Sequence, residues 1–242
     1  MSWRLGFFDV GVIPGVPLAT YLPDAPLDAL IDPPCFCFIA SDGSSIVLID
    51  TGPDGAASAA VGMTITGDTT VLLSAGLRAW GATTDDIDLI IHTHLHYDHM
   101  QNDLAFPCAR VAVQATELSW ATSAAGGPYY LGVADLAEAL NDRLILLDGQ
   151  TELLPGLTAL PNGGHTPGHQ SVLFQTSARQ VCVCGDIVSL QQNLTTIGPV
   201  CPDKAATAAF LKQASAAGWL MLPSHDPDLR EHPWYLPGQT GG

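Results

Sequence analysis

Basic residues are scarce in this chain, whose 242 residues include eight Lys and Arg against 24 Asp and Glu, for a formal net charge of −16. A protein that binds a nucleic-acid backbone needs a cationic surface to displace counterions, and the sequence has no basic stripe. We therefore expect no nucleic-acid partner. Strongly anionic substrates are disfavoured for the same reason, although a local cationic pocket would override the net charge.

Long apolar runs are also missing. No run approaches the roughly 20 residues that a helix needs to cross a bilayer. The amino-terminal stretch 1–9 lacks the apolar core and the cleavage site of a secretory signal. We therefore expect a cytoplasmic protein without a membrane partner.

The six cysteines include no Cys-x-x-Cys pair. Cys35 alternates with Cys37, and Cys182 with Cys184, inside apolar segments, so each pair shares one face of an expected strand. A buried free cysteine behaves there as a small hydrophobe. Because the chain is large and carries no signal sequence, we expect no disulfide framework and interpret these cysteines as core residues.

The sequence does contain enough apolar material for a folded core. Hydrophobic residues make up 47% of the chain and charged residues 13%, a balance that argues against disorder. The length permits a sizeable core, but by itself it leaves open one large domain or two small ones.

Expected strands and helices alternate along the chain. Apolar residues recur at helical spacing over 69–79, a second helix should begin near Thr116, and a third is expected over 203–217. The expected strands cover 35–40, 46–50, 87–92, 110–114, 143–147, 157–160, 171–175, 181–184 and 219–222. This alternation predicts a layered α/β architecture.

A run of potential metal ligands, His-Leu-His-Tyr-Asp-His at 94–99, directly follows the apolar strand expected at 87–92. Three imidazoles and a carboxylate so close together are hard to explain as packing, because a buried polar group without a partner costs roughly 1–3 kcal/mol. His94 and His96 lie two residues apart in extended chain, so both rings point the same way. Imidazole and carboxylate donors without thiolate suit zinc or another first-row divalent ion in an open hydrolytic site.

His-x-His-x-Asp-His after a strand resembles the signature of the metallo-β-lactamase superfamily. Further landmarks of that family appear in the expected order: Asp50 in Asp-Thr-Gly, His165 in Gly-His-Thr-Pro-Gly-His, Asp186 in Cys-Gly-Asp and His225 in Pro-Ser-His-Asp. The match runs from about residue 35 to residue 226. The resemblance implies the four-layer αβ/βα sandwich of the metallo-β-lactamase fold, formed as one domain over 1–242, with the metals at one edge between two sheets.

Carried over residue by residue, the resemblance implies a site for two divalent ions. Two groups of three residues would each hold one ion and one carboxylate would bridge them: His94, His96 and His165 for the first ion, Asp98, His99 and His225 for the second, and Asp186 between the two. Zinc is the favoured metal, with iron, manganese and cobalt as alternatives. Asp50 would brace the loop that carries the first ligands.

The other histidines are interpreted without a ligand role. His92 precedes the motif on its strand and is expected in the core or behind the ligands, and His169 is expected to hydrogen-bond within its own loop. His232, between Glu231 and Pro233, is expected at the surface.

Hydrolysis is the chemistry that such a site predicts. Hydroxide that bridges two divalent ions is available near neutral pH and would attack a carbonyl or phosphoryl centre, with Asp98 as the catalytic residue that carries a proton toward the leaving group. The segments 153–157 and 164–171 resemble the quorum-quenching N-acyl homoserine lactonase branch. The function implied is a dinuclear lactonase acting on an N-acyl homoserine lactone or a related cyclic ester. The alternative is a thioester, phosphoester or other ester hydrolase on the same two-metal scaffold.

The substrate contacts are less well defined than the metal ligands. The lactonases carry a tyrosine three residues after the bridging Asp, where this chain has Ser189, so another donor such as Tyr97, Tyr129 or Tyr130 would have to contact the substrate carbonyl. The apolar stretch 7–12 is interpreted as ordinary packing or a dimer contact, with an acyl-chain groove as the alternative. The expected partner is a small lactone or ester, and a homodimer is compatible with the sequence.

Overall fold

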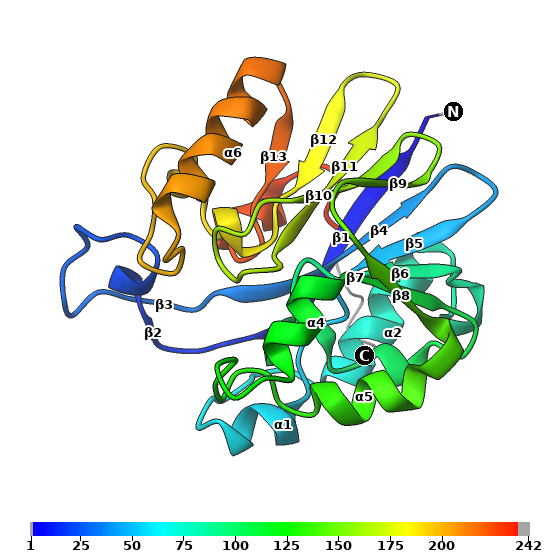
Figure 1. The fold of residues 1–242 in the computed structure, drawn as a ribbon, viewed down its shortest axis with the longest axis horizontal. Helices are drawn as coiled ribbons and strands as arrows, with labels where there is room; N and C mark the ends of the chain where they lie inside the picture. The colour runs from blue at the N-terminus through cyan, green and yellow to red at the C-terminus, as the bar shows by residue number, and fades with distance from the viewer. Residues whose placement is uncertain (1, 237–242) are drawn as a thin grey trace.

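Two packed β-sheets form the centre of the computed structural model, which describes residues 2–236 (Figure 1). The six-stranded sheet has the spatial order β1 (Arg4–Val12), β4 (Pro34–Ser41), β5 (Ile46–Ile49), β6 (Leu89–Ile91), β7 (Arg110–Gln114) and β8 (Leu144–Leu147). The five-stranded sheet has the order β13 (Leu220–Leu222), β12 (Gln180–Val183), β11 (Gln170–Gln175), β10 (Leu157–Pro161) and β9 (Thr151–Leu154). A short ribbon of β2 (Val16–Pro17) and β3 (Leu30–Ile31) extends to the left in Figure 1.

Helices cover the outer faces of both sheets. The first sheet packs against α2 (Thr69–Trp80) and α5 (Val133–Leu140), and the second packs against α6 (Lys204–Ala217). The remaining α-helices are short: α1 (Gly55–Ala60), α3 (Tyr97–Met100) and α4 (Ala115–Ala121). Single 3₁₀ turns occur at Leu18–Thr20, Thr84–Asp86, Asp103–Ala105, Asn141–Arg143, Gly185–Val188, Gln191–Leu194 and Pro227–Glu231. Among residues 2–236, no helix is long and apolar enough to cross a membrane.

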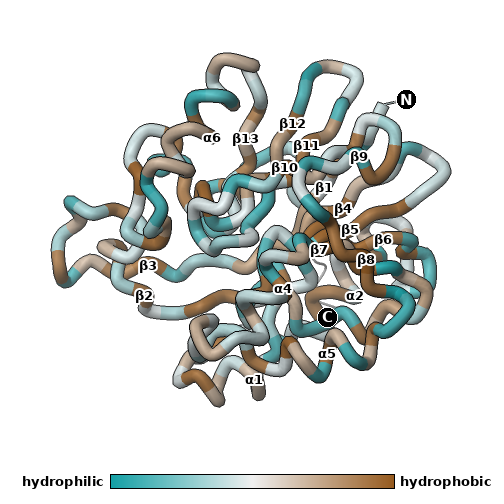
Figure 2. The backbone as a smooth tube through the Cα atoms, in the orientation of Figure 1, coloured by the Kyte–Doolittle hydropathy of each residue, from teal (hydrophilic) through white to brown (hydrophobic). Residues whose placement is uncertain are grey.

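Alternation along the strands divides the core into layers. On β1, Phe7 packs between the two sheets, whereas its neighbour Phe8 packs against α2. Helix α2 approaches this strand closely, because a Cβ on Gly76 would lie 2.1 Å from the ring of Phe8. Figure 2 shows the hydrophobic stretches along strands such as β4 and β8 and hydrophilic residues at the outer turns. The layers are therefore helix, sheet, sheet and helix, and the predicted four-layer αβ/βα sandwich is confirmed.

Most expected elements are observed within a few residues of their predicted bounds. The helix expected over 69–79 is α2, and the one expected over 203–217 is α6. Strand β1 was not predicted, because both of its faces are buried and its sequence therefore lacks the alternation of a half-exposed strand. It pairs antiparallel with β4, opposing Phe7 to Phe38, and Phe7 is fully buried, which confirms the packing interpretation of 7–12.

Parallel pairing brings the functional loops to one edge. Strands β5, β6 and β7 run parallel, and so do β12 and β13 in the other sheet. The carboxyl ends of parallel strands meet at the same edge of a sheet, where the loops after them converge. The loop after β6 contains residues 92–99, the loop after β12 contains Asp186, and the loop after β13 contains His225.

Candidate metal centre

The seven sequence-predicted ligand residues come together at this edge. Their donor atoms fall into three groups, within each of which all atoms lie within 4.8 Å of one another, and the first two groups share His94: His94, His96 and His165; His94, His99 and Asp186; and Asp98 and His225 together with Cys35. The structure therefore brings together residues from four separate stretches of chain, and it adds one residue, Cys35, that was interpreted as a core cysteine.

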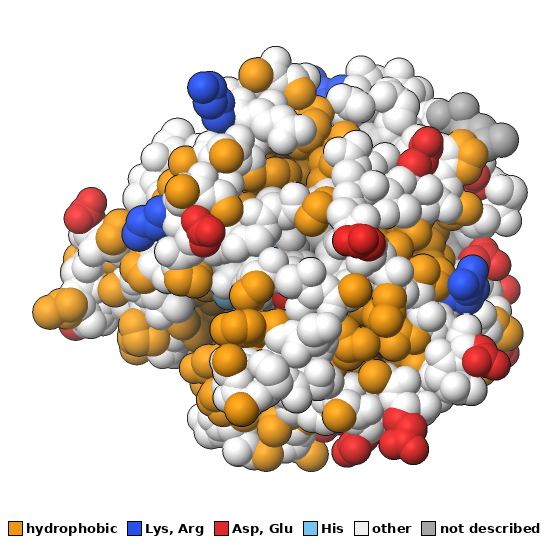
Figure 3. Space-filling view, in the orientation of Figure 1, with side chains coloured by type: hydrophobic (Ala, Val, Ile, Leu, Met, Phe, Trp, Pro, Cys, Tyr) orange, Lys and Arg blue, Asp and Glu red, His pale blue; other side chains and the backbone are white. Residues whose placement is uncertain are grey.

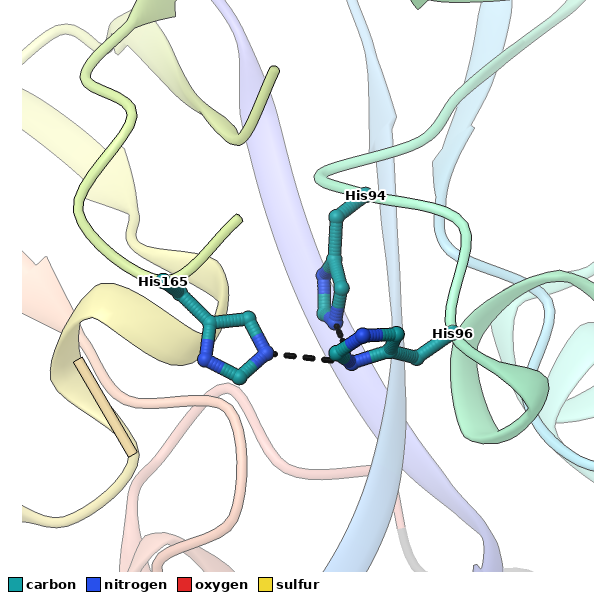
Figure 4. A group of neighbouring side chains, drawn as sticks. All are labelled: His94, His96 and His165. Atoms are coloured by element: carbon teal, nitrogen blue, oxygen red, sulfur yellow. Dashed lines mark hydrogen bonds between the residues drawn. The ribbon is translucent and has the colours of Figure 1, made fainter. Parts of the chain in front are cut away.

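Three imidazoles point toward a common centre in the first group (Figure 4). Nε2 of His94 lies 3.0 Å from Nδ1 of His96, and Nε2 of His165 lies 3.1 Å from the same Nδ1. Nitrogen atoms that share one tetrahedral zinc ion, with bonds of about 2.0–2.1 Å, lie roughly 3.3 Å apart. These three nitrogens are therefore already spaced as the ligands of one ion.

The carboxylate of Asp186 lies between the first group and the other ligands. Its Oδ2 is 3.6 Å from Nε2 of His165, whereas its Oδ1 is 3.3 Å from Nε2 of His99 and 3.0 Å from Nε2 of His225. Oδ2 of Asp98 lies 3.7 Å from each of these last two nitrogens. Asp186 thus offers one oxygen to each of two adjacent ligand sets.

The second ring nitrogen of four histidines is held by an oxygen acceptor behind the ring. Nδ1 of His99 donates to Asp50 at 2.7 Å, Nδ1 of His165 to Val200 O at 2.7 Å and Nδ1 of His225 to Pro34 O at 2.9 Å, while Nδ1 of His94 lies 3.1 Å from the hydroxyl of Thr93. Such contacts fix the ring so that Nε2 presents its lone pair to the centre. Nε2 of His99 is buried and makes no hydrogen bond with any residue of 2–236. This donor arrangement fits divalent metal ions.

Asp50 braces the ligand loop, as predicted. Besides His99, its carboxylate accepts hydrogen bonds from the backbone N–H and the hydroxyl of Thr93, both at 2.8 Å. His92 lies behind the same loop, where its Nε2 donates to Asp103 at 2.8 Å. Asp103 in turn accepts from the hydroxyl of Thr51 at 2.8 Å. The predicted position of His92 is confirmed, whereas Asp103 was not recognised as its partner.

The other two bystander histidines differ in their surroundings. His169 donates to Asn162 in its own loop at 2.7 Å and accepts from the backbone N–H of Asp186 at 3.0 Å, which confirms its supporting role. His232 is half-buried, with its ring 5.8 Å from that of Phe7 and 5.0 Å from that of Trp234. His232 therefore lies at the surface, as expected, with one side of its ring packed against Phe7 and Trp234.

Glu117, on α4, joins the two loops that carry His96 and His165. Its fully buried carboxylate accepts from the backbone N–H of Leu95 at 3.0 Å and from the hydroxyls of Tyr130 at 3.1 Å and Thr166 at 2.7 Å. The N–H of Gly168 is a fourth donor, at 3.2 Å. Sequence reasoning missed Glu117 because a glutamate near the start of a short helix looks like an ordinary exposed residue.

Electrostatics separate the two ligand sets. Burial and the neighbouring imidazoles hold the pKa values of His94 and His96 well below their usual range, so both rings are neutral and able to bind a metal. Although burial opposes it, Asp98 and Asp186 raise the pKa of His99, and Asp186 raises that of His225. The carboxylates of Asp98 and Asp186 therefore stabilise either protonated His99 and His225 or a bound divalent cation, and the two states exclude each other.

A cavity of about 810 Å³ opens beside the first ligand set. Its wall includes His96 and His165 and the apolar or aromatic residues Trp120, Tyr130, Pro167, Pro202 and Ala206. Figure 3 shows histidine atoms at the bottom of a hollow that is bordered largely by hydrophobic side chains. No Lys or Arg is among the residues of 2–236 that line the cavity.

Ser189 is not among the residues that line this cavity. Its side chain is fully buried and its hydroxyl donates to the backbone oxygen of Asp186 at 3.3 Å. Of the three tyrosines named as substitutes, Tyr130 uses its hydroxyl on Glu117 and Tyr97 is buried, whereas Tyr129 is 48% exposed with its ring 5.7 Å from that of His96. Tyr129 is therefore the most exposed of the three, although Tyr130 and not Tyr129 lines the cavity.

Comparisons with known proteins agree with the geometry. The sequence model of the metallo-beta-lactamase superfamily matches residues 30–232. An N-acyl homoserine lactonase from Bacillus sp. is 31% identical over an alignment of 157 residues that covers 61% of this chain and 60% of that protein. The match therefore spans about three fifths of the length of such curated relatives.

Solved structures share the fold. An N-acyl homoserine lactone hydrolase with the product N-hexanoyl-L-homoserine bound at its catalytic metal centre superposes with a TM-score of 0.81 at 21% identity, covering 96% of each chain. AidC, a dizinc quorum-quenching lactonase, superposes with a TM-score of 0.74 at 20% identity, covering 93% of this chain and 88% of AidC.

Proposed function

This chain belongs to the metallo-β-lactamase superfamily, and we propose that it is a two-metal lactonase that opens N-acyl homoserine lactones or related cyclic esters. The curated relatives that are N-acyl homoserine lactonases support this substrate class. Both sheets contribute ligands, so we further propose that residues 1–242 act as a single domain.

The position of Asp186 carries the proposal of two ions. A carboxylate whose Oδ1 lies near His99 and His225 and whose Oδ2 lies near His165 has the arrangement of a bridging ligand. A single ion would require only one of these two donor sets. We assign the ligands as follows: His94, His96 and His165 to the first ion, Asp98, His99 and His225 to the second, and Asp186 to both.

The metal we propose is zinc at both positions. Imidazole nitrogens predominate among the donors, and zinc accepts them together with carboxylate oxygen in sites that keep a position open for substrate. AidC, described as dizinc, supports the choice. Iron, manganese and cobalt share enough of this ligand preference to stand as alternatives.

Two divalent ions at such a centre lower the pKa of water and polarise a carbonyl oxygen. The chain supplies the remaining requirements. The apolar wall formed by Trp120, Pro167 and Pro202 would hold the acyl or other apolar substituent and exclude bulk water from the ester. Asp98 would carry a proton to the alkoxide oxygen that leaves when the ring opens. Tyr129 is the candidate hydroxyl donor to the carbonyl, because Ser189 is committed to a backbone oxygen.

Anionic thioesters and phosphoesters fit this cavity less well. Their negative groups would need a cationic partner away from the metals, and none of the residues that line the cavity is Lys or Arg. The net charge of −16 would also slow their approach. A neutral lactone meets neither penalty.

Hydrolysis of a lactone panel tests the proposal. The panel pairs N-acyl homoserine lactones of short and long acyl chain with aliphatic and aromatic lactones, each assayed at neutral pH with and without a chelator. We expect turnover of the acyl homoserine compounds that a chelator abolishes and zinc restores. Turnover of phosphoesters or thioesters in preference to every lactone would contradict the substrate class, and activity that survives complete metal removal would contradict the metal dependence.

A further inference from the structure

Cys35 lies at the second ligand set, although its sequence context is that of a core strand. Its sulfur lies within 4.8 Å of a carboxylate oxygen of Asp98 and a ring nitrogen of His225. Ligand atoms on one tetrahedral zinc ion, with bonds of about 2.3 Å to sulfur and 2.0–2.2 Å to nitrogen or oxygen, lie roughly 3.6 Å apart. The thiol therefore lies close enough to these two residues for a small movement of the side chains to bring all three onto one ion.

The backbone of β4 holds the thiol in this place. His225 donates from Nδ1 to the carbonyl oxygen of Pro34, the residue directly before Cys35, at 2.9 Å. This hydrogen bond ties the backbone directly before Cys35 to the ring of His225. Only 1% of Cys35 is exposed.

Cys35 also differs from the other buried cysteines in its hydrogen bonding. The sulfur atoms of Cys37, Cys182, Cys184 and Cys201 each donate to a backbone carbonyl oxygen. Within residues 2–236, Cys35 has no such acceptor, and the nearby polar atoms are ligand atoms. Nε2 of His99, which is buried and equally without a hydrogen-bond partner within residues 2–236, lies 3.7 Å from Oδ2 of Asp98.

We propose that Cys35 is a thiolate ligand of the second metal ion. The inference rests on the two-metal centre of the proposed function and adds a fifth donor to Asp98, His99, His225 and Asp186 at that position. On binding, the S–H bond breaks, the proton passes to solvent and a sulfur lone pair forms the bond to the metal. A thiolate makes the second position softer than the first, so that it selects zinc or cobalt over manganese.

Cobalt substitution tests the assignment independently of catalysis. The metal-free protein is loaded with two equivalents of Co²⁺, and the visible ligand-field bands and the near-ultraviolet sulfur-to-cobalt charge-transfer band are recorded. The wild-type protein should show both, with charge-transfer intensity for one Co–S bond per chain. Cys35→Val should lose the charge-transfer band and keep the ligand-field bands. Cys182→Val is the matched control, because it removes another buried thiol by the same change and should keep both.

A measurement on the wild-type protein alone covers the case in which Cys35→Val fails to fold. X-ray absorption at the zinc edge should detect a sulfur scatterer at about 2.3 Å, at one sulfur per two zinc ions. Two bound metals without a sulfur signal would overturn the role of Cys35 and leave the lactonase proposal intact. A charge-transfer band that persists in Cys35→Val would do the same. Failure of the wild-type chain to bind two ions would overturn both proposals.

Discussion

Asp98 and Asp186 illustrate how two carboxylates in one centre differ at the scale of single residues. Asp186 lies 3.0 Å from His225 and 3.3 Å from His99, whereas Asp98 lies 3.7 Å from both. Asp186 also accepts a hydrogen bond from Ser224 at 2.7 Å. Although burial opposes it, His225 and His99 hold the pKa of Asp186 well below its usual range, so Asp186 stays ionised. Asp98 is the less firmly held carboxylate, which is compatible with the proton-carrying role that we propose for it.

Asp98→Asn should therefore lower turnover more than metal content. The amide keeps an oxygen for the ion but cannot take up and release a proton, so kcat should fall by about 10²–10⁴-fold. Metal analysis should find nearly two ions per chain. Asp186→Ala is the comparison, because it should lose metal and activity together. Equal loss of metal and turnover in Asp98→Asn would reduce Asp98 to a ligand only.

Glu117 acts at the same scale but without contact with the centre. Its carboxylate satisfies four donors from the two ligand loops, and a buried donor left unpaired costs about 1–3 kcal/mol. Glu117→Ala should therefore lower the free energy of unfolding by at least about 3 kcal/mol and weaken metal binding. Glu117→Gln keeps the shape of the side chain but places an amide NH₂ group against hydrogen-bond donors. Its losses of stability and of metal affinity should therefore be smaller than those of Glu117→Ala. Urea unfolding and metal titration measure both effects, and an unchanged metal affinity in Glu117→Ala would contradict the bracing role.

At the scale of elements, the centre depends on how α4 meets the loop 165–168. A Cβ built on Gly168 would lie 2.1 Å from the backbone nitrogen of Glu117. Because the nearest atoms belong to the backbone of Glu117, no flexible side chain can move aside to relieve the overlap. The glycine in Gly-His-Thr-Pro-Gly-His is therefore required by close packing between a loop and a helix, which the spacing of the motif did not reveal.

Gly168→Ala should displace the loop that carries His165. We expect a loss of about 1–3 kcal/mol in stability from the overlap together with weaker binding at the first metal position, measured by thermal unfolding and by metal titration. Gly55→Ala is the matched control, since a Cβ there meets nothing within 4 Å. A Gly168→Ala protein as stable and as metal-rich as this control would show that α4 and the loop can separate freely.

At the scale of the whole molecule, the candidate ligands come from loops of both sheets. The loop after β6 in the first sheet supplies His94, His96 and His99, while the loops after β12 and β13 in the second sheet supply Asp186 and His225. The hydrophobic core between the sheets, with Phe7, Phe38 and Phe174 among its residues, already joins these layers. Bound metal would add a second connection at the open edge.

Metal removal should therefore lower the stability of the entire fold. A ligand present at about 1,000 times its Kd stabilises the native state by about 4 kcal/mol, which for a chain of this size corresponds to a shift in Tm of roughly 10 °C. Thermal unfolding with and without a chelator measures the shift. Asp186→Ala should show little response to the chelator. An unchanged Tm in the wild-type protein would mean that the metals do not couple the two sheets.

The sequence by itself determined the family, the layered architecture and the candidate ligand residues, because His-x-His-x-Asp-His places several donors on one short loop and the downstream motifs are equally local. Most strand and helix positions followed from periodicity. Strand β1 did not, since both of its faces are buried. Only the tertiary structure decided which oxygen of Asp186 faces which ligand set, that Glu117 and Asp103 are buried supports, and that Cys35 lies beside His225, 190 positions along the chain. Such relations depend on how two sheets pack, and no local pattern contains that information.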